Sequence, residues 1–149
     1  MSSIASLILT AAQVQTAVQR LDVYRLPQRT LSLWAKQSVV VPSVRYDGIR
    51  GREHPRLYNL SDLAKCRLVV RMRRAGISMA RTRITLAMID ADLKAAFHPR
   101  TPASLVVDGL RVYVVKDGLP ARELPDGQFR LQLDECFTGT IAEARRLTA

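Results

Sequence analysis

The spacing of apolar residues changes once along the chain. Up to about residue 97, apolar residues recur every three or four positions, which predicts amphipathic helices. After Pro102 many apolar residues alternate with polar ones, as in the segment FRLQL (129–133), and this alternation predicts strands. The pattern therefore predicts an α+β fold, with helices in the first two thirds of the chain and a small antiparallel β-rich region after them.

Local signals mark the first two helices. Thr10 and Gln13 stand three residues apart, as the hydroxyl and the amide of a capping box do, and a first helix is expected directly after Thr10. Pro27 suits the entry of a second helix, because the first turn of a helix leaves its N–H groups without helical partners. This second helix is expected over about residues 28–37, with Trp34 directed inward.

Two more helices follow a second capping pair, which is formed by Asn59 and Asp62. The third helix is expected to end just before Gly76, because glycine suits the left-handed conformation of a helix C-terminus. Ser78 then opens a fourth helix, which extends to about Phe97.

The segment between the second and third helices has a different character. Val39–Val41 is predicted to be a short strand, and Pro42 confines that strand to the edge of a sheet. Residues 43–56 are rich in arginine and contain few apolar side chains. We expect a basic hairpin there, with its turn near residues 47–51.

Turn signals divide the last third of the chain into strands. Three Asp-Gly pairs supply the positive φ angles that tight turns require. The strands between them are expected to form a sheet of three or four strands, closed by a short helix over about residues 140–147. The sequence thus predicts a first domain over residues 1–97 and a small β-rich domain over residues 103–149.

The positive charge is concentrated in one segment. The chain has 23 Lys and Arg residues against 13 Asp and Glu residues, a net charge of +10. Residues 20–83 hold 15 of the basic residues and only four acidic ones, whereas residues 84–149 hold eight basic and nine acidic residues. This distribution favours a single electrostatic face for a polyanion such as nucleic acid.

Signals for other classes of protein are missing from the sequence. Cys66 and Cys136 lack CxxC or Cys/His spacing, and His54 and His98 have no ligand partner nearby, so no metal site is expected. The motifs of phosphate binding, dinucleotide binding and nucleophilic catalysis are missing too, and we expect neither an enzyme nor a cofactor. Without a signal peptide or an apolar run of ~20 residues, the expected compartment is the cytoplasm, with no membrane partner.

Two stretches resemble the MerR-type winged helix-turn-helix family. The first is RTLSLWAKQSVVVPSVR (29–45), where Thr-Leu and a nearby aromatic precede a turn, a proline and a wing arginine. The second is RLYNLSDLAKCRLVVRMRRAGISM (56–79), with the ordered Tyr, Asp-Leu, Arg and Gly-Ile-Ser of the family. The resemblance covers about residues 8–90 and implies four helices with a β wing. The chain departs from the family at Ser32, where many members have an arginine that meets DNA.

The resemblance implies a protein that binds double-stranded operator DNA. A homodimer is expected, because one half-site rarely gives enough specificity. In such a module the second helix enters the major groove, and the residues expected to face the groove are Arg29, Ser32 and Lys36. The residues expected to contact phosphates are the wing residues Arg45, Arg50, Arg52 and Arg56 and the hydroxyl of Tyr58.

The end of the chain resembles the tail of VapB-like antitoxins, through the stretch DGLRVYVVKDGLPARELPDGQFRLQLDE (108–135). Such proteins join a DNA-binding head to an end that binds a PIN-type ribonuclease toxin, so the resemblance implies a repressor that is also an antitoxin. Arg145 and Arg146 would pair with the carboxylates that hold Mg²⁺ in the nuclease. The plainer interpretation is two solvent-exposed arginines near a chain end. A stand-alone MerR-like regulator and an excisionase-like architectural protein remain alternatives.

Overall fold

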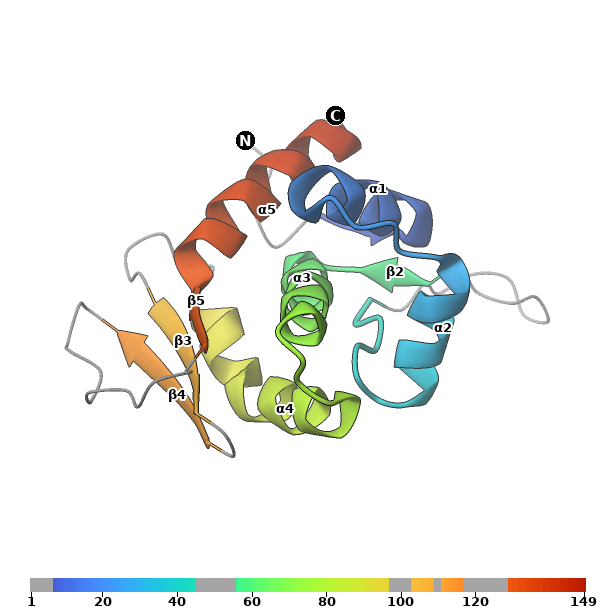
Figure 1. Cartoon of the computed structure of the whole chain (residues 1–149). Coiled ribbons are helices and arrows are strands. Elements are labelled where there is room, and N and C mark those ends of the chain that lie inside the picture. The colour runs from blue at the N-terminus through green and yellow to red at the C-terminus, as the bar shows by residue number, and fades with distance from the viewer. Residues whose placement is uncertain (1–6, 45–55, 97–102, 109–110, 117–128) are drawn as a thin grey trace.

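A computed structural model describes residues 7–44, 56–96, 103–108, 111–116 and 129–149 of the chain (Figure 1). The helices in these ranges are α1 (Ala11–Asp22), α2 (Gln28–Lys36), α3 (Leu60–Arg74), α4 (Met79–Ala96) and α5 (Leu133–Thr148). The strands are β1 (Leu9–Thr10), β2 (Leu57–Tyr58), β3 (Ala103–Asp108), β4 (Arg111–Lys116) and β5 (Phe129–Gln132). Figure 1 shows α3 in the middle of the molecule, with the other helices around it.

Local interactions explain where α1 and α2 begin. The Thr10 hydroxyl accepts a hydrogen bond from the Gln13 backbone N–H at 3.2 Å, and the Gln13 side-chain oxygen accepts one from the Thr10 N–H at 2.8 Å. The predicted capping box is therefore confirmed. α2 follows Pro27, whose φ of −67° is the value that the pyrrolidine ring favours.

α3 carries a capping interaction at each end. The Asn59 side chain accepts a hydrogen bond from the Asp62 N–H at 2.9 Å, and the Asp62 carboxylate accepts one from the Asn59 N–H at 3.0 Å. At the other end Gly76 has a φ of +82°, and the Ile77 N–H donates to the Met72 carbonyl at 3.0 Å. This is a Schellman motif, so glycine ends α3 as predicted.

The predicted strand at Val39–Val41 is wrong, because these residues form no strand and lie in the irregular chain that follows α2. The N–H groups of Val39 and Val40 both donate to the Trp34 carbonyl, at 2.8 and 3.4 Å, and Ser38 reverses the chain with a φ of +56°. Both valine side chains are buried in the core. Their apolar character therefore serves packing, which outweighs the strand preference of β-branched residues.

The predicted hairpin at residues 43–56 falls mainly outside the described residues, but its two ends are described and meet. The Val44 N–H donates to the Leu57 carbonyl at 3.2 Å, which forms an isolated antiparallel bridge. β2 continues from this bridge and pairs with β1, with Leu9 opposite Tyr58. This small sheet holds the start of α1 beside the chain that enters α3.

The core forms around α3, which is buried on almost all sides. Its buried apolar side chains are Leu60, Leu63, Ala64, Cys66, Leu68, Val69, Val70 and Met72. α3 also buries Ser61, Asp62 and Arg67, so it lies in the interior although it is not apolar on all sides. α1, α4 and α5 all contact α3, as expected for a central helix (Figure 1).

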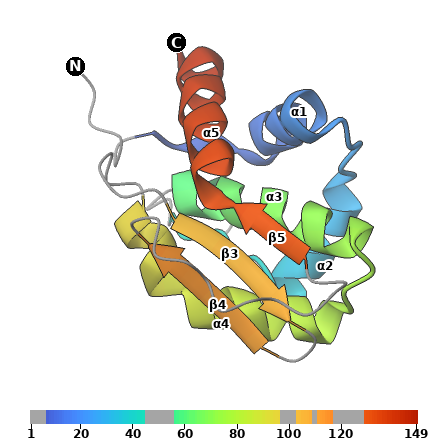
Figure 2. The same cartoon turned by 60° about the vertical axis from the view of Figure 1, so that its left-hand side comes forward.

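A second antiparallel sheet follows α4, with its strands in the order β4-β3-β5. The sheet lies beside α4 (Figure 2). α5 begins at Leu133, where the alternation predicted a strand, and it is much longer than the helix expected over residues 140–147. A five-residue alternation does not separate the last residue of a strand from the first of a helix. α5 contacts α1 and α3, and the division into domains over 1–97 and 103–149 stays a prediction.

Candidate nucleic-acid interface

α2 has one face in the core and another in solvent. Leu31 and Trp34 are only 1% and 3% exposed, so they hold the helix against the rest of the molecule. The predicted inward direction of Trp34 is therefore confirmed. Arg29 and Lys36 are exposed, and Ser32 is half-buried. The helix thus offers two cations to a ligand while its apolar side fixes its position.

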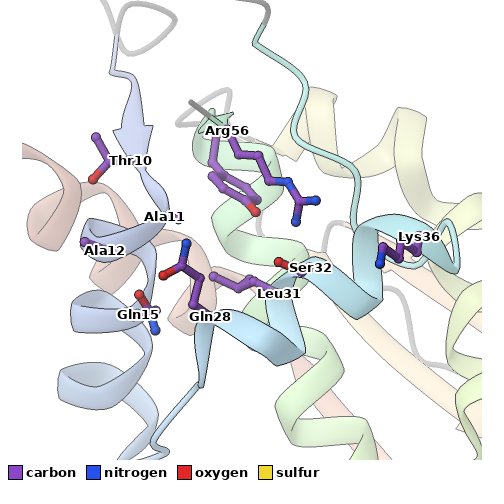
Figure 3. A pocket seen from close by; sticks show the side chains of 10 residues that line it. Thr10, Ala11, Ala12, Gln15, Gln28, Leu31, Ser32, Lys36 and Arg56 are labelled. Carbon is purple, nitrogen blue, oxygen red and sulfur yellow. The ribbon is translucent and has the colours of Figure 1, made fainter. Parts of the chain in front are cut away.

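A concave surface that encloses a volume of about 800 Å³ lies along one side of α2. Its walls come from the start of α1, from α2 and from the chain at β2 (Figure 3). α2 contributes Gln28, Ser32 and Lys36, and Arg56 stands directly before β2. Each of these side chains carries an N–H or O–H donor, so the surface suits an anion.

The first turns of α1 form one wall of this concave surface, through Thr10, Ala11, Ala12 and Gln15. α1 has no acidic residue in its first turn, although a helix start is where carboxylates are favourable. The positive end of the helix dipole is thus uncompensated there and adds to the attraction for an anion. Sequence reasoning missed this wall, because a capping box marks a helix start without saying what lies beside it.

Tyr58 closes the concave surface on the side of the core. Its side chain is 0% exposed, and its buried hydroxyl has no hydrogen-bond partner among the described residues. Burial raises the pKa of this hydroxyl to about 12, with Cys66 and Asp62 adding to the rise and Arg56 opposing it. The hydroxyl therefore keeps its proton at neutral pH and lies close to the Arg56 side chain, whose interaction with it opposes the rise in pKa.

Three of the predicted wing residues, Arg45, Arg50 and Arg52, lie outside the described residues. Arg56 is described; it is exposed and lines the concave surface. The other described candidates for DNA contact also come together at this surface, except Arg29, which is exposed on α2 without lining it.

Part of the basic segment serves the interior rather than a ligand. Arg67 is 3% exposed, and its Nε lies 2.9 Å from Oδ2 of Asp22. Arg71 Nε lies 3.4 Å from the same carboxylate. Arg74 donates to the backbone carbonyls of Asp22 and Val23, at 2.7 and 3.0 Å. These arginines stabilise the C-terminal end of α1, so the charge of the segment does not all lie on one face.

The two arginines predicted to bind a toxin lie in the last turn of α5. Arg145 is exposed. Arg146 donates to both carboxylate oxygens of Glu143, at 2.7 and 3.1 Å, which lowers the pKa of Glu143 and raises that of Arg146. Neither arginine lines the concave surface beside α2, so the predicted DNA-binding and toxin-binding residues do not share it.

Other kinds of site find little support in the described part of the chain. No group of three or more His, Cys, Asp or Glu residues is placed there to hold a metal ion. Cys66 is buried, and burial is the main cause that raises the pKa of its thiol, as for an unreactive core cysteine. No helix among these residues has the length and apolar character that crossing a membrane requires.

In a comparison with known protein families, residues 16–89 match the model of the family described as MerR HTH family regulatory protein. The matched range contains α2, β2 and α3, and with them most of the wall of the concave surface. No curated protein matches the chain with significant similarity. The resemblance predicted over about residues 8–90 is confirmed over the matched range. Residues 16–89 therefore resemble a helix-turn-helix domain of the MerR family, and this similarity suggests a DNA-binding transcription regulator.

Proposed function

We propose that this protein is a sequence-specific transcriptional repressor that binds operator DNA with α2 in the major groove. The observation that carries the proposal is the concave, donor-lined surface beside the exposed face of α2 (Figure 3). Its donors come from separate elements of the fold, and its described lining includes no carboxylate. The backbone of DNA, which has a phosphate at every nucleotide, is the polyanion that suits this surface.

The proposed contacts have different roles. Arg29 and Lys36 project from the exposed face of α2, where they meet base edges or adjoining phosphates. Ser32 is short and half-buried, so it reaches only a group that comes close to the helix. Arg56 and the Tyr58 hydroxyl hold one phosphate against the start of α1.

Selection from a library of random DNA duplexes tests this proposal. The full chain should enrich one site, and its affinity for that site should fall as the salt concentration rises. Lys36→Gln and Arg56→Gln should each reduce the slope of log affinity against log salt by about one. Arg145→Gln makes the same charge change on α5 and should leave the slope unchanged. Equal binding to all duplexes, or no binding, would contradict sequence-specific regulation.

We further propose that the protein binds DNA as a homodimer. One α2 reads only a few base pairs, and dimers obtain specificity by binding two half-sites about one helical turn apart. The enriched sites should therefore be inverted repeats with centres about 34–36 Å apart. Light scattering of the complex should give two chains for each duplex. A single chain on an unrepeated site would be the opposite result.

A second proposed activity is neutralisation of a PIN-type ribonuclease by the C-terminal region, as the antitoxin of a toxin–antitoxin pair. Its support is Arg145, which is exposed in the last turn of α5 beside Arg146. The nuclease site is a group of carboxylates around Mg²⁺, and an arginine placed there would pair with them and displace the ion. The repressor would then control the operon that encodes both proteins.

Co-purification with the product of the adjacent gene, followed by a ribonuclease assay, tests the antitoxin activity. We expect a tight complex without nuclease activity, and Arg145→Glu should release that activity, whereas Arg25→Glu should not. Truncation of α5 is a poorer test, because Ala144 lies in the core and the Leu147 carbonyl accepts a hydrogen bond from Gln13 at 3.0 Å. If no complex forms, a stand-alone regulator or an excisionase-like architectural protein is the better description.

A further inference from the structure

The exposed face of α2 carries an apolar side chain between its two cations. Leu33 is 48% exposed, although Leu31 and Trp34 on the core side of the same helix are almost completely buried. Residues three or four positions apart share one face of a helix. Leu33 therefore lies on the same face as Arg29 and Lys36, both of which are exposed.

The surroundings of Leu33 separate it from an ordinary exposed leucine. Single apolar residues on a protein surface are common and need no special explanation. Leu33, however, lies on the helix that we place in the major groove, and residues 23–46 contain no Asp or Glu. The other large apolar side chains found exposed in the described residues are Ile8, Val23, Val41 and Ile84, and none of them lies on α2. The ligand that fits this face is a polyanion that also presents an apolar group. Its anionic groups would meet Arg29 and Lys36, and its apolar group would meet Leu33.

We propose that Leu33 determines sequence specificity by contacting the 5-methyl group of a thymine. This inference rests on the proposed function. Thymine presents a methyl group in the major groove, and apolar side chains distinguish it through that group. A leucine excludes water from the methyl group but makes no hydrogen bond to a base edge. Leu33 therefore selects at one base pair, whereas Arg29 and Lys36 hold the helix in the groove.

Replacement of thymine by deoxyuracil is a direct test, because it removes only the methyl group and keeps the base pair. In the enriched duplex, each thymine is replaced in turn, and affinity is measured by fluorescence anisotropy. At one position the wild-type chain should bind about three- to fivefold more weakly, which is the effect of losing one buried methyl group. Leu33→Ala should bind the thymine and deoxyuracil duplexes equally.

Two further variants control for changes in the fold. Ile84→Ala also truncates an exposed aliphatic side chain, which is 60% exposed on α4, and it should keep the preference for thymine. Leu33→Met keeps a long apolar side chain at the same position and should keep part of the preference. Thermal unfolding of each variant shows whether it is folded at the temperature of the binding assay.

The outcomes distinguish this inference from the proposed function. The inference is overturned if Leu33→Ala keeps the full preference for thymine, or if the wild-type chain binds thymine and deoxyuracil equally at every position. Sequence-specific binding itself would stand in both cases. If the wild-type chain enriches no duplex at all, the proposed function fails, and the role of Leu33 fails with it.

Discussion

The Nε atom of Arg67 lies 2.9 Å from Oδ2 of Asp22, and both side chains are only 3% exposed. The same guanidinium has Nη2 at 3.2 Å from Oδ1 of Asp22 and donates from Nη1 to the Thr140 hydroxyl at 2.9 Å. One side chain of α3 therefore joins the end of α1 to α5. Since α5 lies outside the matched residues 16–89, this contact ties the C-terminal helix to the part of the chain that resembles a helix-turn-helix domain.

Arg67→Met should lower the free energy of unfolding by about 3–5 kcal/mol, because it leaves the buried Asp22 carboxylate without its main partner. Urea unfolding followed by circular dichroism measures the change. Arg20→Met is the matched control, since Arg20 is 53% exposed and pairs with Glu143 at 3.1 Å. An exposed pair of that kind contributes roughly 0–1 kcal/mol. Equal losses in the two variants would contradict the structural role of Arg67.

Tyr58→Phe should change stability and DNA affinity in opposite directions. It removes a buried hydroxyl that has no partner among the described residues, so the free energy of unfolding should rise by up to about 1 kcal/mol. It also removes a proposed phosphate contact, so the affinity for the enriched duplex should fall. The slope against salt should not change, because a neutral hydroxyl displaces no counterion, whereas Arg56→Gln reduces it.

Urea unfolding and fluorescence anisotropy on the same preparations of Tyr58→Phe give the two results. A loss of stability would show that the hydroxyl already has a partner in the free protein. Unchanged affinity would remove Tyr58 from the proposed DNA contacts and leave Arg56 as the main phosphate ligand of the concave surface.

Two positions with positive φ angles should respond in opposite ways to substitution. Gly76 has a φ of +82°, and an added Cβ would meet nothing within 4 Å, so Gly76→Ala should cost about 1 kcal/mol through backbone strain alone. Val23 has a φ of +49° and is 76% exposed, so Val23→Gly should relieve strain and raise stability by about 0.5–1 kcal/mol. Thermal and urea unfolding measure both changes, and shifts of the same sign would be the contrary result.

Interactions between residues close in sequence were predictable in this protein. Thr10 with Gln13, and Asn59 with Asp62, show their capping roles in residue type and spacing, and Gly76 shows its role in its freedom to take a positive φ angle. Such signals need no knowledge of the remaining fold. The start of α1 and the boundaries of α2 and α3 were correspondingly close to those predicted.

Interactions between distant residues were not predictable from the sequence. Asp22 and Arg67 are 45 residues apart, and nothing near either residue indicates that they pair. The excess positive charge of residues 20–83 pointed to a ligand surface, but the arginines on α3 that contact Asp22 stabilise the fold. Val39 and Val40 have a strand preference, and the turn after α2 buries them instead. In each case tertiary packing determines the partner or the conformation of a residue, which its local sequence does not specify.

Glu143 should make part of the stability depend on pH. Its carboxylate accepts hydrogen bonds from Arg146 and lies 3.1 Å from Arg20 Nε, and these interactions lower its pKa from the ordinary value of 4.5. A carboxyl group with a lowered pKa in the folded state stabilises that state above its ordinary pKa. The contribution is lost as the pH falls through the folded-state value.

Glu143→Gln should therefore be less stable than the wild-type chain at pH 7, by roughly 0.5–1 kcal/mol, since its arginine partners are about half exposed. The difference should shrink as the pH falls below about 4.5, where Glu143 of the unfolded wild-type chain becomes protonated, and it should vanish below the lowered pKa of the folded chain. Urea unfolding of both chains at pH 7 and at successively lower pH values measures this convergence. A difference that stays constant over the whole range would show that the substitution acts through packing of α5, and not through the charge of Glu143.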